Sequence, residues 1–127
     1  MEISKELLSE VLGSPLSYLN ISCDNKCEVR HSTMFENYQE GVAYTYLYGN
    51  QETRFMSKYE LAFKLKEWLY SKDIMFDIKY HTNSNPRRIT IMTYGKKSNF
   101  YIGDNKKDEV GALIKLGEST LKEINEK

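Results

Sequence analysis

Apolar residues recur at helical spacing in three segments of the chain. In the first segment, Ser4 is placed to cap a helix, and Ile3 can pack onto Leu8 across that cap. Gly13 and Pro15 follow the apolar stripe, and this pairing predicts the end of the helix. The residues of the predicted stripe are Leu7, Leu8, Val11 and Leu12.

The second helix has the strongest start signal in the sequence. Ser57-Lys58-Tyr59-Glu60 matches the capping box S-x-x-E, and Met56 and Leu61 flank it as a hydrophobic staple. Its core stripe is predicted to be Leu61, Ala62, Leu65, Trp68 and Leu69. A third helix is expected from Asp104 or Asn105 to about Ile124, with the stripe Val110, Leu113, Ile114, Gly117, Leu121 and Ile124.

Alternation of apolar and polar residues predicts strands between these helices. Residues 42–48 and 52–55 are expected to form a hairpin that turns at Gly49-Asn50, and residues 32–40 to form a loop. The full predicted order is α-β-β-β-β-α-β-β-β-α. Because strands joined by short turns pair antiparallel, we expect one α+β domain over residues 1–127, with helices packed on one curved sheet.

Length and composition are those of a globular domain. The 127 residues suit one domain, and no apolar run approaches the roughly 20 residues needed to cross a bilayer. The N-terminus, Met1 to Glu6, lacks the basic-then-apolar pattern of a signal peptide. The sequence therefore predicts a cytoplasmic location, with no membrane partner.

Charge is balanced overall but unevenly distributed. The chain has 18 basic and 18 acidic residues, and residues 79–107 contain seven basic side chains against Asp104 alone. Solvated hairpin tips and a helix start would explain this segment, and so would an anionic partner. The candidate nucleic-acid-binding residues within it are Arg87, Arg88, Lys96, Lys97, Lys106 and Lys107.

Residues that could carry chemistry are few and do not form a motif. Cys23, Cys27, His31 and His81 could make a metal set, but their spacing does not fit a zinc knuckle pair. No phosphate-binding glycine pattern is present, and Asp108-Glu109 is explained by the dipole of the helix that it starts. We therefore expect a protein that is not an enzyme and that uses no catalytic residue, cofactor, metal or small-molecule substrate.

The second helix has an unusual aromatic face opposite its core stripe. With Leu61 at 0° and about 100° per residue, the core centres near 40° and the opposite face lies between about 140° and 200°. Charged residues are normal on such a face, whereas this one carries the rings of Tyr59, Phe63 and Tyr70 beside a single lysine, Lys66. Burial under the N-terminal region would explain the rings. The other explanation is a binding surface for a partner protein or a second copy of the chain.

Two resemblances bear on function. The second half has the order α-β-β-β-α, which is similar to that of the double-stranded RNA-binding domain. As in that family, two lysines open the last helix, in the segment Gly103-Asp104-Asn105-Lys106-Lys107. The alanine-rich second helix of the family is absent. The stretch 58–68 resembles a helix of small prophage proteins of the phage ABA sandwich kind. The opener 3–13, the aromatic strand 99–102 and residues 109–115 resemble the same proteins. This second resemblance implies a helix–sheet–helix sandwich and a mobile-element origin, with a bacterial host cell as the location and no catalytic residues.

These observations rank the possible functions. The leading interpretation is a non-enzymatic accessory protein of a phage or related element that binds, or binds and inhibits, another protein, such as one of host defence. The alternative is an RNA- or DNA-binding module that uses the basic segment 79–107. Overall charge favours the first interpretation, because a dedicated nucleic-acid binder is usually basic throughout.

Overall fold

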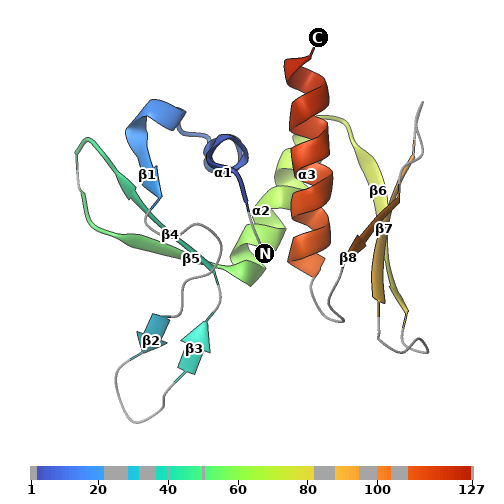
Figure 1. The fold of residues 1–127 in the computed structure, drawn as a ribbon, viewed down its shortest axis with the longest axis horizontal. Helices are drawn as coiled ribbons and strands as arrows, with labels where there is room; N and C mark the ends of the chain where they lie inside the picture. Colours follow the sequence, from blue (N-terminus) through green and yellow to red (C-terminus); the bar gives the residue numbers. More distant parts are fainter. Residues whose placement is uncertain are drawn as a thin grey trace. The chain divides into compact units, whose positions relative to one another are not determined.

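The computed structural model describes residues 3–21, 29–31, 37–39, 41–49, 51–81, 88–94, 100–103 and 109–126. Within these ranges the element order is α1-β1-β2-β3-β4-β5-α2-β6-β7-β8-α3, with a short 3-10 turn, η1 (Leu16–Tyr18), after α1 (Figure 1). Every strand pair is antiparallel. The α+β class is confirmed, and the order matches the predicted one apart from one additional strand in the first half.

The chain divides into two compact units, residues 1–61 and residues 62–127. The boundary falls inside α2 (Lys58–Ser71), so the helix begins in the first unit and continues in the second. The single domain expected from chain length stays a prediction.

The first unit opens with α1 (Lys5–Leu12), which begins and ends as the sequence predicts. The Ser4 hydroxyl accepts a hydrogen bond from the Leu7 amide at 3.1 Å, which satisfies one of the free donors of the first turn. Gly13 closes the helix in the left-handed conformation (φ 70°), where a residue without Cβ is favoured. Ile3, Leu7 and Leu8 are buried, whereas Val11 and Leu12 are only half-buried.

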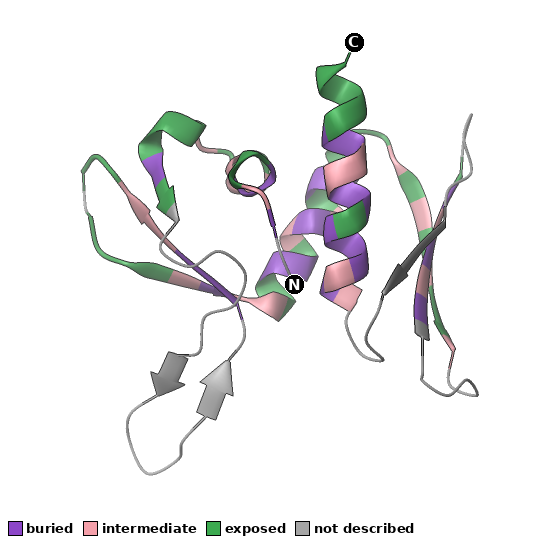
Figure 2. Cartoon of the chain, in the orientation of Figure 1, coloured by how far each residue is buried: buried purple, intermediate pink, exposed green. Residues whose placement is uncertain are grey.

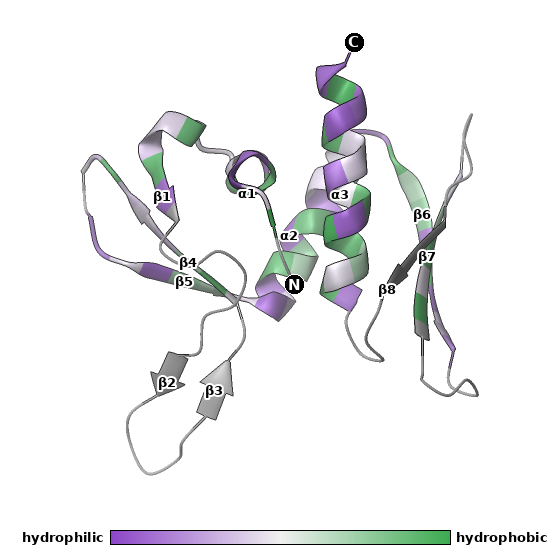
Figure 3. Ribbon diagram, viewed as in Figure 1, coloured by the Kyte–Doolittle hydropathy of each residue, from purple (hydrophilic) through white to green (hydrophobic). Residues whose placement is uncertain are grey.

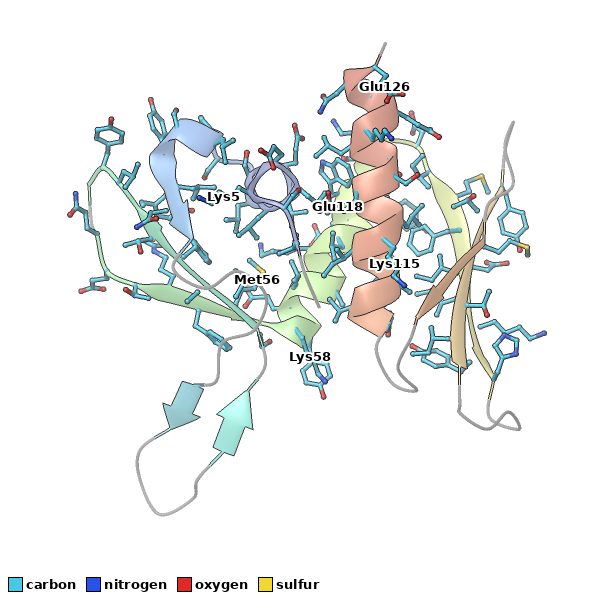
Figure 4. The ribbon with its side chains drawn as sticks, in the orientation of Figure 1. Lys5, Met56, Lys58, Lys115, Glu118 and Glu126 are labelled. Atoms are coloured by element: carbon cyan, nitrogen blue, oxygen red, sulfur yellow. The ribbon has the colours of Figure 1, made fainter. Side chains whose placement is uncertain are left out.

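The strands of the first unit form two sheets. β1 (Leu19–Ile21), β4 (Gly41–Tyr46) and β5 (Arg54–Ser57) form a three-stranded sheet in the order β1-β4-β5. β2 (Val29–His31) pairs with β3 (Asn37–Gln39) in a separate two-stranded sheet. The buried side chains of the first sheet are Leu19, Val42, Ala43 and Met56, the last of which is labelled in Figure 4.

Two predictions for this region are wrong. The segment 32–40, expected to be a loop, contains β3. The sequence does not reveal this strand, because the polar stretch Asn37-Tyr38-Gln39 has no alternation of apolar and polar residues. The single sheet is also wrong, since the strands of the described residues lie in three sheets. β1 pairs with β4 and not with its sequence neighbour β2, a long-range choice that turn signals do not encode.

The second unit contains an antiparallel meander, most of α2 and the whole of the last helix. β6 (Met75–His81), β7 (Arg88–Tyr94) and β8 (Phe100–Gly103) follow one another in the sheet, and α3 (Glu109–Asn125) packs on β7 and β8. Ile89, Ile91 and Thr93 share the buried face of β7. The α-β-β-β-α order predicted for the second half is therefore confirmed.

Helix α3 is buried over most of its length and exposed in its last turn (Figure 2). Its buried residues recur at helical spacing from Val110 to Leu121, and Figure 3 shows the hydropathy of each residue along the helix. Ile124 was expected to belong to this stripe, but its side chain is 39% exposed. The final turn therefore extends beyond the packed part of the helix, and the core stripe ends at Leu121.

Helix α2 also begins as the capping box predicts. The Glu60 amide donates a hydrogen bond to the Ser57 hydroxyl at 3.3 Å. Leu61, Leu65 and Leu69 are fully buried, and Ala62 and Trp68 nearly so, which confirms the predicted core stripe. The chain leaves the helix through Asp73, whose positive φ of 58° is a conformation that aspartate tolerates better than most residues.

Candidate partner-binding site

The aromatic side chains opposite the core stripe of α2 are exposed to solvent. Tyr59 is 77% exposed, Phe63 63% and Tyr70 76%. They follow one another at helical spacing along a single face, because four residues make about one turn and seven about two. The ammonium of Lys58 lies 5.4 Å from the centroid of the Tyr59 ring. We call Tyr59, Phe63 and Tyr70 the α2 aromatic face.

Lys66, predicted for the same surface, is engaged in an intramolecular ion pair. Its Nζ contacts Oε1 of Glu109 in the first turn of α3, with side-chain exposures of 39% and 23%. The Tyr80 hydroxyl on β6 donates to the other carboxylate oxygen, Oε2, at 2.6 Å. Lys66 therefore borders the α2 aromatic face while its charge is balanced inside the second unit. We call Lys66, Tyr80 and Glu109 the carboxylate cluster.

The carboxylate cluster shifts the pKa of two of its members. Burial alone would raise the pKa of Glu109, but hydrogen bonds from Lys66 and Tyr80 outweigh it and lower the pKa below its usual value. The hydrogen bond to Glu109, together with partial burial, raises the pKa of Tyr80 to about 12. At neutral pH the carboxylate is therefore charged and the phenol is neutral, which suits a structural cross-link between elements.

The sequence did not predict this cluster. The helix dipole alone accounts for Glu109 in the sequence, and no pattern there gives Tyr80 a polar partner. Two signals were present in the sequence, since a glutamate stands at a helix start and a tyrosine on the inward face of β6. Neither signal specifies a partner 29 residues away.

The other candidate residues lie mainly outside the described part of the chain. Cys23, Cys27, Arg87, Lys96, Lys97, Lys106 and Lys107 are all outside it, and only the backbone of His31 and Arg88 is described. His81 lies on β6, with Nε2 2.8 Å from the Thr90 hydroxyl of β7. Among the side chains that are described, no three His, Cys, Asp or Glu residues gather as a metal site would need.

The α2 aromatic face combines apolar area with polar hydroxyl groups. Tyrosine rings offer apolar area together with a hydroxyl that stays hydrated, and aromatic residues are enriched at the centres of protein interfaces.

None of the described helices has the length and apolar character to cross a bilayer. No family model matches the chain, and no match is found among curated proteins or solved structures.

Proposed function

We propose that this chain is a non-enzymatic binding protein whose α2 aromatic face docks onto another protein. The observation that carries the proposal is the exposure of three aromatic rings on one face of a single helix. Scattered exposed apolar residues are normal on a protein surface, whereas these three rings recur on one side of a single helix over about three turns.

The helix itself supports this proposal. Its core stripe is already buried, so the second face is not needed to hold α2 in place. A helix that presents aromatic anchors at positions i, i+4 and i+11 has the form of an interface helix, in which rings fill pockets of the partner. Because α2 is packed along its opposite face, the rings are presented with little ordering cost upon binding.

We further propose that the chain is an accessory protein of a phage or related mobile element and acts in the cytoplasm of the bacterial host. The resemblance of residues 58–68 and 109–115 to small prophage proteins supports this origin. On this proposal, docking through the α2 aromatic face covers a functional surface of a host protein and inhibits it.

The test is affinity capture from bacterial cells with the full chain as bait. We expect a partner that is retained by the wild-type chain and lost with Phe63→Ala and with Tyr70→Ala, since aromatic anchors often contribute about 2 kcal/mol or more to binding. Tyr48→Ala is the matched control, because Tyr48 is similarly exposed but belongs to another part of the chain. Equal loss with the control, or equal retention with all three variants, contradicts the proposal.

The second candidate function, nucleic-acid binding, is favoured by the net charge of +6 over residues 79–107. A gel-shift series with duplex RNA, duplex DNA and single strands tests it at low and moderate salt. Binding through phosphate contacts should weaken steeply with salt, because each contact releases counterions. Absence of any shift at low salt removes this candidate.

A further inference from the structure

Strand β6 ends its sheet with an edge that is open among the described residues. In the order β6-β7-β8, it hydrogen-bonds to β7 on one side only. With seven residues it is the longest edge strand described, since β5 and β8 have four each and β1 has three. Over residues 75–80, the outer edge presents backbone N–H and C=O groups to which another strand can add.

The side chains of β6 alternate between the two faces of the sheet. Phe76 and Ile78 are half-buried on the face that also bears the buried β7 residues Ile91 and Thr93. Asp77 and Lys79 are exposed on the other face. The strand therefore carries one acidic and one basic residue two positions apart, placed symmetrically about Ile78.

We propose that β6 is a homodimerisation strand, which pairs antiparallel with β6 of a second copy about a twofold axis at Ile78. In this register Asp77 lies opposite Lys79 of the second copy, and Lys79 lies opposite Asp77. Directly opposed residues on one face of an antiparallel pair have Cβ atoms about 4.5–5.5 Å apart, so both charge pairs are within reach. The two meanders then join into one six-stranded sheet.

The opposite face of the strand is complementary in the same register. Phe76 lies opposite Tyr80 of the second copy, and Ile78 lies opposite Ile78. Cross-strand aromatic pairs stabilise a sheet, and the half-buried Phe76 and Ile78 gain cover from the added strand. Tyr80 keeps its hydroxyl on Glu109, and its exposed ring supplies the new contact.

Charge also disfavours the neighbouring registers. An antiparallel pair built by a twofold axis normal to the sheet centres on one residue of the strand. Centring on Asp77 would place two carboxylates directly opposite each other, and centring on Lys79 would do the same with two ammonium groups. Like charges in opposed positions are destabilising, so the register at Ile78 is selected against both alternatives.

The predicted dimer is small and therefore weak. One pair of seven-residue strands buries less surface than the standard stable interface of about 1,600 Å². We expect a monomer–dimer equilibrium that depends on protein concentration, measurable by sedimentation velocity on the full chain. A wild-type chain that stays monomeric up to its solubility limit overturns the proposal.

The charge pairs provide the decisive variants. Asp77→Lys and Lys79→Asp each place like charges opposite each other twice, and each should weaken self-association about 10-fold or more. Mixing the two variants should restore the dimer, because every opposed pair in the mixed species is again of opposite charge. Failure of the mixture to associate more tightly than either variant alone overturns the proposed register.

Three control variants separate the charge pairs from other effects. Lys5→Asp on α1 (Figure 4) and Glu123→Lys on α3 make the same charge changes at exposed positions that do not belong to β6, and both should leave the dimer intact. Tyr94→Phe removes the hydrogen bond that the Tyr94 hydroxyl donates to Asp77, and it should also leave the dimer intact. A dimer that is lost with Phe63→Ala and unaffected by the β6 variants would place the contact on α2 and overturn this proposal.

Cross-linking tests the twofold axis directly. In a chain with Cys23→Ser and Cys27→Ser, Ile78→Cys should form an intermolecular disulfide on mild oxidation, because opposed Cα atoms about 4.5–5.5 Å apart are within disulfide range. Met75→Cys is the control, since six residues of strand separate its two copies by about 20 Å. Efficient linking of the Met75→Cys variant and none of the Ile78→Cys variant overturns the proposed pairing.

Discussion

The Tyr80 hydroxyl donates a hydrogen bond to the carboxylate of Glu109 at 2.6 Å, across 29 residues of sequence. This contact ties β6 to the first turn of α3. Lys66 on α2 contacts the other oxygen of the same carboxylate, so one side chain connects three elements of the second unit. Hydrogen bonds that involve a charged partner are about twice as strong as neutral ones, so the Glu109 carboxylate is a strong polar link between these elements.

Replacing Glu109 with Gln should destabilise the fold at neutral pH by roughly 1–3 kcal/mol, since charge-assisted bonds to Lys66 and Tyr80 are lost. The folded-state pKa of Glu109 is lowered, so this stabilisation is present above the unfolded pKa and disappears as pH falls through the folded pKa. The stability difference between wild type and variant should therefore shrink below about pH 4.5. Urea unfolding at several pH values measures it.

Glu123→Gln is the control for that series, because Glu123 is an exposed residue of the last turn of α3. Its stability should differ little from that of the wild type at any pH. A Glu109→Gln difference that stays constant from pH 7 to pH 3 would show that the carboxylate charge contributes nothing.

Sequence reasoning succeeded where the determinants are local. The start of α2 depends on Ser57 and Glu60, three residues apart, and the end of α1 depends on Gly13. Apart from β3, a polar strand without apolar alternation, its failures concern long-range partners. β1 joins β4 across the β2–β3 hairpin, and Glu109 finds Tyr80 on a distant strand, because burial and sheet closure decide such pairings after local structure has formed.

For the candidate site, the helical period alone identified the α2 aromatic face. The rotation of 100° per residue separates Phe63 from Leu65 by more than half a turn, and the structure buries Leu65 while exposing Phe63. The period could not show that Lys66 is paired with Glu109, because the partner lies on another helix.

Gly41→Ala should destabilise the first unit strongly. A Cβ at this position would lie 2.0 Å from the Met56 carbonyl oxygen and 2.7 Å from Cζ of Phe55, so the paired backbone of β5 would have to move. Overpacking of this kind typically costs about 1–3 kcal/mol, and a clash with backbone belongs at the upper end or beyond. Thermal melting followed by circular dichroism measures the loss.

Gly49→Ala separates that clash from a general cost of replacing glycine. A Cβ at Gly49 meets no atom within 4 Å, and only the positive φ of 77° opposes it. We expect a cost of about 1–2 kcal/mol, from the left-handed backbone alone. Equal melting temperatures for the two variants would mean that β4 and β5 adjust without strain.

The fold is expected to be independent of zinc. His81 already has a hydrogen-bonding contact with Thr90, and the spacing of Cys23, Cys27 and His31 does not fit a structural zinc site. Addition of a chelator should leave the melting curve unchanged, and protein purified from metal-poor buffer should contain far less than one zinc per chain. Unfolding by the chelator would contradict this expectation.

Phe63→Ala distinguishes a binding surface from a covered core. With 63% of its side chain exposed, Phe63 contributes little to folding, so the variant should lose less than about 1 kcal/mol. The higher helix propensity of alanine offsets part of that loss. Leu65→Ala, two residues along the same helix and fully buried, should instead cost about 2–5 kcal/mol. Thermal melting of both variants provides the comparison. A loss of about 3–5 kcal/mol at Phe63 would be the value of a core aromatic, and the α2 aromatic face would then be covered within the chain and closed to a partner.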